Sequence, residues 1–373
     1  MGSLESKKMD WLIVFAVIPI IAAGLVTMKS FTGESGFFSR QLVWAVVSII
    51  VFFLASRIDL QVLKRTNVAF WMYVIGMLFL VGVLIAGNVV NGARSWFSFG
   101  AFSFQPSDVV KISLILLLAK YYSRRHVEIR HVKHVLVSAA YALVPLILIF
   151  LEPDFGSAII IFMIWFGMTL VSGISKKHLA VVFMVGIATF AGLWFFVFKP
   201  YQKERVVNFL NPYYDIRGSG YNAFQSRIAV GSGGLLGKGV GFGTQSRLQY
   251  LPEYQTDFIF AAFTEEWGFI GALILLTLYG LLLARILRAA LTGASNFETL
   301  FATGFAIMIL SHLLINIGMN IGIMPVTGIT LPFMSYGGSH LLVEFTALGL
   351  IVSMRRYSRA AHREDFDKEF VGM

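Results

Sequence analysis

The chain has 373 residues, of which 57% are hydrophobic and only 13% are charged, and its mean hydropathy is +0.76. This composition excludes an ordinary soluble domain and predicts an all-α polytopic membrane protein. The sequence contains no cysteine, which excludes disulfides and thiolate metal sites. We treat residues 1–373 as one transmembrane domain.

Ten apolar runs are long enough, or nearly so, to cross a bilayer as helices. We read the first run as a retained span, because it is longer than the apolar region of a cleavable signal. The runs lie near residues 11–28, 42–56, 67–87, 108–123, 134–151, 156–173, 179–198, 258–284, 299–322 and 340–354.

Lys and Arg gather in alternate connections between these runs, which predicts the orientation, because cytoplasmic loops are enriched in basic residues. With both termini in the cytoplasm, the short outer connections contain only Lys29, Arg40 and Arg94. The formal net charge of +10 then reflects topology, and no nucleic-acid partner is needed to explain it.

One connection, residues 199–256, is far longer than the others and is predicted to be extracytoplasmic. Its many aromatic residues favour an ordered loop over a disordered one. The glycine-rich run from Gly231 to Gly243 superficially resembles a phosphate loop, but it lacks the Lys-Ser/Thr pair and is not set between a strand and a helix. Tight turns, or backbone amides close to a pyrophosphate, are the better interpretations.

Carboxylates cluster where this loop meets the next apolar run, in the segment from Leu251 to Gly268. A carboxylate at a membrane boundary can meet a lipid-linked substrate whose head is in water. Asp257 has two interpretations from local sequence, a general base or a helix N-cap, and the two roles can coexist.

Six ordered motifs resemble the SEDS family (shape, elongation, division and sporulation), most closely its RodA-type members, over essentially all ten runs. Two positions depart from the usual pattern: Asp108 stands where the family has Glu, and Glu152 stands where it has Gln. The motifs are Asn91-Gly-Ala-Arg-Ser-Trp-Phe97, Gln105-Pro-Ser-Asp-Val-Val-Lys111, Glu152-Pro-Asp-Phe-Gly-Ser157, Tyr221 through Ser226 into the glycine-rich run, Leu251 to Ala261, and Pro325 to Ser339.

The resemblance implies a peptidoglycan glycosyltransferase that polymerises lipid II during cell elongation, at the outer face of the bacterial cytoplasmic membrane. It places the catalytic carboxylate at Asp257, acting as general base in an inverting transfer. It also implies a class B penicillin-binding protein and other elongation-complex membrane proteins as partners. The alternatives are a flippase for the same lipid, since buried charges would serve a transporter equally well, and a scaffold for other cell-wall enzymes.

A pyrophosphate leaving group needs positive charge. The candidate contacts are Arg94, Lys111 and, in the long loop, Arg205, Arg217, Arg227, Lys238 and Arg247. For the loop residues, a plain surface role is an equally good interpretation. An intramembrane Lys111 indicates either a functional cavity or a local ion pair with Asp108, three residues earlier on the same helix.

Further candidates for substrate contact are Trp96, Glu253, Glu265 and Ser335. Trp96 can pack on a sugar face or lie at the membrane interface. The rotation of an α-helix favours Glu265 over Glu266 as a neighbour of Asp257, and leaves Glu266 to bond a neighbouring helix.

No metal site follows from residue spacing. A divalent cation, Mg²⁺ or Mn²⁺, could still bind Glu253 and Asp257 together with phosphate oxygens. The polar stripe of His312, Asn316 and Asn320 is typical of hydrogen bonding between helices, as are His340 and Glu344, four residues apart.

Overall fold

The computed structural model describes residues 11–31, 36–59, 63–64, 66–90, 93–99, 102–124 and 131–371. Lys7 and Lys8, on which part of the orientation argument rests, lie outside these ranges. Each predicted apolar run forms a helix: α1 (Trp11–Phe31), α2 (Phe37–Ala55), α4 (Thr66–Ala86), α5 (Pro106–Ser123), α6 (Val132–Leu151), α7 (Phe155–Val171), α8 (Lys176–Phe196), α12 (Ile259–Leu291), α13 (Asn296–Ile321) and α14 (Gly338–Val371).

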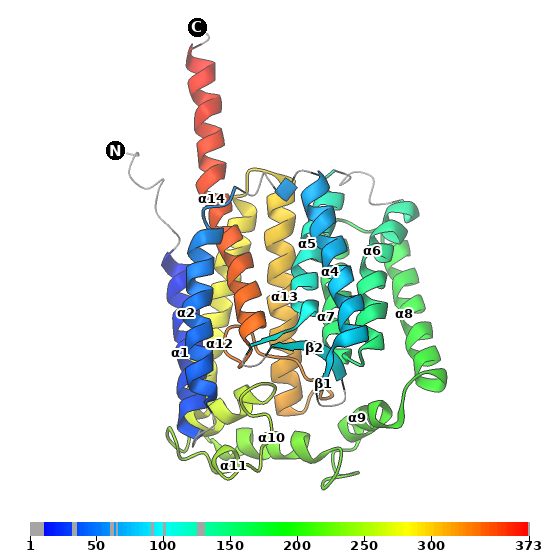
Figure 1. The fold of residues 1–373 in the computed structure, drawn as a ribbon, viewed down its shortest axis with the longest axis vertical. Coiled ribbons are helices and arrows are strands. Elements are labelled where there is room, and N and C mark those ends of the chain that lie inside the picture. Colours follow the sequence, from blue (N-terminus) through cyan, green and yellow to red (C-terminus); the bar gives the residue numbers. More distant parts are fainter. Residues whose placement is uncertain are drawn as a thin grey trace.

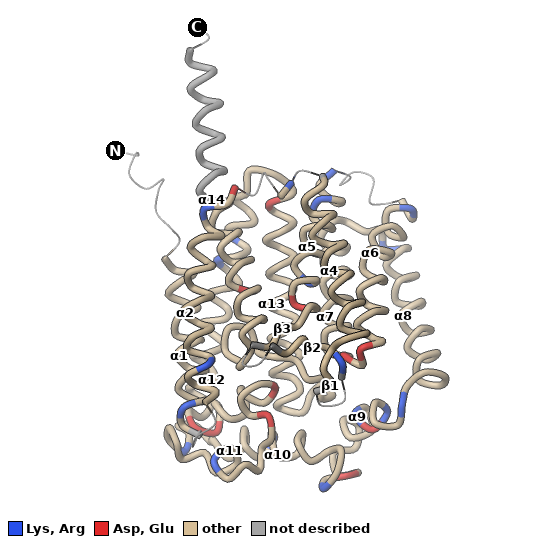
Figure 2. The backbone as a smooth tube through the Cα atoms, in the orientation of Figure 1, with Lys and Arg blue, Asp and Glu red and all other residues tan. Residues whose placement is uncertain are grey.

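The prediction of an all-α membrane protein with ten apolar helices is confirmed. Seven described helices are long and apolar enough to cross a membrane, and the apolar parts of α7 and α14 are somewhat shorter. Helix α5 carries Asp108, Lys111 and Lys120 within its 18 residues. In Figure 2 most charged residues lie toward the two ends of the bundle.

Helices α5 and α13 form the centre of the bundle. Nearly every side chain of α5 is buried, and α13 packs against α5, α7 and α12. Helix α8 stands at the rim (Figure 1), and none of its side chains is buried. A helix that is apolar all round and packs on little protein is suited to contact with lipid.

A small antiparallel sheet between α4 and α5 was not predicted. Its strands, in the order β1-β2-β3, are β1 (Asn88–Val90), β2 (Ala93–Phe99) and β3 (Phe102–Phe104). Trp96 of β2 lies opposite Asn88, next to a β-bulge. Aromatic residues alternating with serine in β2 and β3 fit a half-buried strand, but strands this short are hard to recognise within an apolar sequence.

The long connection is ordered, as predicted, and contains three short helices: α9 (Pro200–Leu210), α10 (Tyr221–Ser232) and α11 (Thr244–Arg247). In Figure 1 they cover the end of the bundle opposite the C-terminus. We call this end, formed by residues 88–90, 93–99, 102–104, 152–154, 199–257 and 322–337, the loop end.

The glycine-rich run packs against a break in α12. Gly268 has φ 66° and ψ −166° and interrupts the helix. The amides of Lys238 and Gly239 donate to the carbonyls of Glu265 and Glu266, at 3.0 Å each, and Phe269 N donates to Gly234 O at 2.9 Å. A Cβ on Gly237 or Gly268 would overlap the opposing backbone. The glycines therefore serve close backbone packing, which favours the tight-turn interpretation over a phosphate site.

Small residues in a helix allow close packing of a neighbour, and in α13 the glycines pack against other parts of the same chain. A Cβ on Gly304 would meet Ile115 and Met168, and a Cβ on Gly322 would meet the side chain of Arg227. These small residues make room for neighbours within the chain.

Candidate functional site

Asp257 lies in a tight turn that ends where α12 begins. Glu253, at φ 52°, starts the turn, and its carbonyl accepts hydrogen bonds from the amides of Thr256 and Phe258, both at 3.2 Å. The N-cap position is Phe258, and no side chain caps the helix. The N-cap interpretation of Asp257 is therefore wrong, and its carboxylate makes no hydrogen bond or ion pair with any described residue.

Two asparagines of α13 hold the backbone of Asp257. The Nδ2 atoms of Asn316 and Asn320 donate to its carbonyl oxygen, at 2.9 Å and 3.0 Å. Asn316 also donates to Ile329 O at 2.6 Å, and Asn320 Oδ1 accepts from Ala261 N at 3.2 Å. The predicted hydrogen bonding between helices is confirmed, and it is directed at the turn that carries Asp257.

The loop between α13 and α14 encloses the other side of this turn. Ser335 Oγ donates to Thr256 O at 2.6 Å and accepts from Leu331 N at 2.8 Å, and Tyr336 N donates to Gln255 O at 2.8 Å. A Cβ on Gly328, which has φ +73°, would lie 3.5 Å from Asp257 Oδ2. The Ser335 hydroxyl is thus occupied by backbone groups, and a contact with substrate remains a prediction.

The half-buried Asp257 carboxyl is electrostatically tuned. Burial raises its pKa to about 7, and the negative charges of Glu253 and Asp154 act in the same direction, while Arg205 opposes them. A carboxyl that titrates near neutral pH can take up a proton during a reaction and release it again.

Asp154 is the main residue that sequence reasoning missed. It caps α7 by accepting from Ser157 N at 3.0 Å, and its second oxygen accepts from Gln105 Nε2 at 3.0 Å. Because its charge also acts on Asp257, the turn between α6 and α7 belongs to the same site. The Glu-Pro-Asp motif from Glu152 to Asp154 was the available signal.

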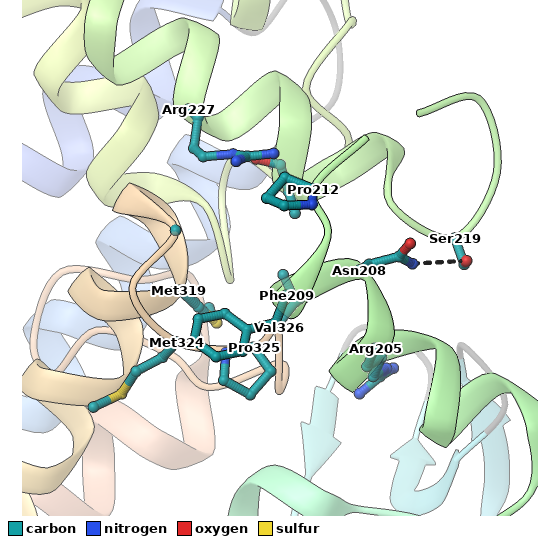
Figure 3. Close-up of a pocket in the computed structure, with 12 residues that line it drawn as sticks. Arg205, Asn208, Phe209, Pro212, Ser219, Arg227, Met319, Met324, Pro325 and Val326 are labelled. Carbon is teal, nitrogen blue, oxygen red and sulfur yellow. Dashed lines mark hydrogen bonds between the residues drawn. The ribbon is translucent and has the colours of Figure 1, made fainter. Parts of the chain in front are cut away.

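Arg205, whose charge acts on Asp257, also lines a pocket. The pocket encloses about 390 Å³, including its opening to solvent. Figure 3 shows Arg205 of α9 and Arg227 of α10 on two sides of the apolar residues Phe209, Pro325 and Val326. Two guanidinium groups beside an apolar wall can hold a phosphate whose other end is hydrocarbon.

Lys111 and Asp108 lie in a separate, buried network in the middle of the bundle. Lys111 Nζ is 3.1 Å from Asp108 Oδ1, and Asp108 also accepts from Ser339 Oγ at 3.2 Å. His340 bridges Asp108, at 3.2 Å, and Glu344, at 2.9 Å. The local ion pair is therefore present, and no described contact joins Lys111 to Asp257.

This network holds the loop that encloses Asp257. Glu344 Oε2 accepts from Phe333 N at 2.8 Å, and the His312 ring lies 3.2 Å from Thr330 O. The ring centroids of His312 and His340 are 5.0 Å apart. The buried charged residues thus hold the loop that encloses Asp257, and they make no described contact with Asp257 itself.

Lys238 and Glu265 form a second structural pair. Their Nζ and Oε1 atoms are 2.7 Å apart, and Glu265 also accepts from Thr244 Oγ1 and Gln245 N. Glu266 accepts from Gly241 N at 2.6 Å, and its side chain also interacts with Ser30 of α1, as the prediction of a bond to a neighbouring helix requires. Both glutamates fasten the long loop to α12.

Arg94 and Trp96 lie on β2 at the loop end. Arg94 is exposed and donates from Nη1 to Leu84 O at 3.3 Å, and its backbone N donates to Glu152 O at 3.2 Å. Trp96 is half-buried. The sheet therefore borders the turn between α6 and α7, and direct contact of either side chain with substrate remains a prediction.

No group of three or more His, Cys, Asp or Glu side chains that could hold a metal ion occurs among the described residues. Glu253 is near enough for its charge to raise the pKa of Asp257. Alone they supply two carboxylates, which is the share of the coordination shell that protein often gives to Mg²⁺ bound with a phosphate.

The fold and this site define a polytopic membrane protein with a tuned carboxyl at one end of its helical bundle. The family described as cell cycle protein, which joins FtsW, RodA and SpoVE, matches residues 7–360. The chain belongs to this family, the SEDS family that the sequence motifs resemble.

Curated relatives match almost end to end. Stage V sporulation protein E of Bacillus subtilis is 37% identical over 360 residues, which cover 94% of this chain and 98% of the relative. Peptidoglycan glycosyltransferase MrdB of Escherichia coli K12 is 34% identical over 356 residues, which cover 95% of each chain.

Solved structures share the fold. A chain of a peptidoglycan synthase complex that coordinates polymerization and crosslinking matches with a TM-score of 0.81 at 34% identity, over 94% of this chain and 99% of that one. The rod shape determining protein RodA of Thermus thermophilus matches with a TM-score of 0.71 at 32% identity, over 94% of this chain and 97% of that one.

Proposed function

We propose that the protein is a peptidoglycan glycosyltransferase that polymerises lipid II into glycan strands for cell elongation, with Asp257 as general base. The observation that carries the proposal is the Asp257 carboxyl: it is unpaired among the described residues and has a pKa of about 7, and its turn is held by α13 and by the loop between α13 and α14. The relative named MrdB, matched along its whole length, supports the activity.

In the proposed transfer, Asp257 takes the proton from the acceptor sugar's hydroxyl as its oxygen attacks the anomeric carbon of the donor. The new glycosidic bond forms while the bond from that carbon to the pyrophosphate oxygen breaks, and the lipid pyrophosphate leaves with the electron pair. One displacement inverts the α-linked donor to a β-linked polymer, so a single base is sufficient.

The pocket lined by Arg205 is suited to the pyrophosphate. Arg205 and Arg227 would offset its charge, and the apolar wall of Pro325 and Val326 would contact the first units of the lipid. Glu253 and Asp257 could share a Mg²⁺ or Mn²⁺ ion with the pyrophosphate oxygens; such an ion would add positive charge at the leaving group.

The proposed location is the bacterial cytoplasmic membrane, with both termini in the cytoplasm and the loop end outside. The distribution of Lys and Arg among the connections supports this orientation. The partner we propose is a class B penicillin-binding protein, together with other membrane proteins of the elongation complex. The match to a chain of a synthase complex that couples polymerization to crosslinking supports it.

The decisive experiment is polymerisation of lipid II by the purified protein, followed on a denaturing gel. Asp257→Asn keeps the shape of the side chain but cannot accept the proton, so the rate should fall by about 10² to 10⁴. Asp215→Asn is the matched control, because Asp215 is an exposed carboxylate of the same loop that binds only its own turn.

Polymer of wild-type yield from Asp257→Asn would remove the base assignment. Lipid II crossing vesicle membranes without polymer formation would favour the flippase instead. If the protein were only a scaffold for other enzymes, cells carrying the Asp257→Asn variant would grow normally.

A further inference from the structure

Glu152 is a fully buried carboxylic acid with no partner for its side chain. It follows α6, and its backbone is well bonded: its N–H donates to Ile149 O at 3.1 Å, and its carbonyl accepts from Arg94 N at 3.2 Å. Neither side-chain oxygen forms a hydrogen bond with any residue in the described part of the chain. A buried carboxylate without donors is strongly unfavourable, so this side chain should keep its proton.

The charged groups around Glu152 also favour the neutral form. Asp154 follows it in the chain and lies close enough to repel its charge. Both Asp154 oxygens accept hydrogen bonds, from Ser157 N and Gln105 Nε2, which hold this side chain in place close to Glu152. Arg94 of β2 faces Glu152 with its backbone, while its guanidinium donates to Leu84 O.

Burial, and then the charge of Asp154, raise the pKa of the Glu152 carboxyl to about 8. The charge of Asp154 in turn raises the pKa of Asp257. The three carboxyls therefore form one electrostatic series, in which Glu152 is the deepest and Asp257 meets the substrate.

We propose that Glu152 is a positioning residue of the transfer site, which works as a neutral acid beside Asp154 and switches the site off when it loses its proton. The proposal rests on the proposed function of Asp257. A second negative charge beside Asp154 would draw water or a cation into the turn between α6 and α7, and so strain the contacts of Asp154 with Gln105 and Ser157. It would also repel an anionic pyrophosphate.

Glu152→Gln tests the charge state, because the amide has the size of the acid and stays neutral at every pH. The unfolded chain loses the Glu152 proton near pH 4.5 and the folded chain near pH 8, so the wild type loses stability between these values as pH rises. The Tm of Glu152→Gln, relative to wild type, should therefore increase from pH 5 to pH 8 and then level off. Glu204→Gln, on α9 of the same end, is the control and should show no such change.

The polymerase pH profile tests the positioning role. Above about pH 8, wild-type activity should fall by about tenfold per pH unit, the limit for loss of one proton. Glu152→Gln should lack this alkaline decline, so its rate at pH 9 should be no lower than its own rate at pH 7. An alkaline decline that is the same in both proteins would overturn the positioning role.

The two measurements separate the possible failures. A Tm difference that does not change with pH would mean that Glu152 is ionised or solvated, and this would overturn the inference whatever the activity. If the wild type forms no polymer, the proposed function fails, and with it the positioning role. The Tm series would then still decide whether Glu152 keeps its proton.

Discussion

Two groups of charged residues lie close together in this protein and are built in opposite ways. In the buried network, Lys111, Asp108, His340 and Glu344 pair with one another and with backbone amides. At the loop end, Glu152 and Asp257 make no side-chain hydrogen bond with the described residues, and Asp154 and Glu253 add to the negative charge around them.

The difference indicates that the paired residues have a structural role and the unpaired carboxyls a chemical one. Paired charges in a low-dielectric interior fix geometry, and their cost is offset by their partners. Burial without a partner disfavours the charged form of a carboxyl and raises its pKa. Such a carboxyl can therefore exchange protons near neutral pH. Mutations in the two groups should therefore have different effects. In the buried network they should mainly lower stability, and at the unpaired carboxyls they should mainly change the rate and its pH dependence.

Breaking the buried network should have the largest effect on stability. Lys111→Met leaves Asp108 with less compensation and should lower the free energy of unfolding by about 3 to 5 kcal/mol. The double variant Asp108→Leu, Lys111→Met should recover most of it, because the pair of His340 and Glu344 remains. Urea titration and polymer yield measure both effects. A double variant that is stable but inactive would instead support a role of Lys111 in a substrate cavity.

Acid should lower the polymerisation rate, because it protonates the unpaired carboxyl of Asp257. Asp257 must be ionised to act as base, and its pKa is about 7. The rate should thus fall about tenfold per pH unit below that value, or roughly 100-fold at pH 5. Initial rates of polymerisation between pH 5 and pH 8 provide the check, and a flat profile would contradict the base assignment.

The stability of the folded protein should change with pH in the opposite direction to the polymerisation rate. The folded-state pKa of Asp257, about 7, is above the ordinary value of 3.8 for an aspartate, so the folded protein holds this proton longer and loses stability as pH rises from about 4 to about 7. Asp257→Asn should therefore melt above the wild type at pH 8, and the difference should shrink toward pH 4.

Sequence patterns predicted the helices well, because a bilayer demands long apolar runs. They also placed Asp257 at the correct junction. They could not show that Ser335 is occupied by Thr256 O, or that Glu265 pairs with Lys238, since both contacts depend on how distant segments meet. Helical periodicity alone placed Glu265 beside Asp257; the break at Gly268 and the docked glycine-rich run were not visible to it.

The asparagines under Asp257 should show an intermediate effect. Asn316→Ala removes the donor to Ile329 O and one of the two donors to Asp257 O, and leaving the Ile329 carbonyl unsatisfied should cost about 1 to 3 kcal/mol. Because the turn would loosen, the polymerase rate should fall along with Tm. Ser311→Ala on the same helix is the control, since that hydroxyl binds only its own helix at Ile307 O, and it should keep the wild-type rate.

Lys238 offers the smallest and most discriminating test, because its two interpretations predict different measurements. As the structural partner of Glu265, it stabilises the docked loop, and its side chain is 28% exposed. Lys238→Gln should then lower Tm modestly, by an amount equivalent to about 1 to 2 kcal/mol, since the Glu265 carboxylate keeps Gln245 N and Thr244 Oγ1 as donors. The KM for lipid II should stay unchanged.

If Lys238 contacts the pyrophosphate instead, its substitution should raise the KM and leave Tm unaltered. Measuring both quantities on one preparation decides whether paired charges at the loop end also belong to structure, as they do in the middle of the bundle.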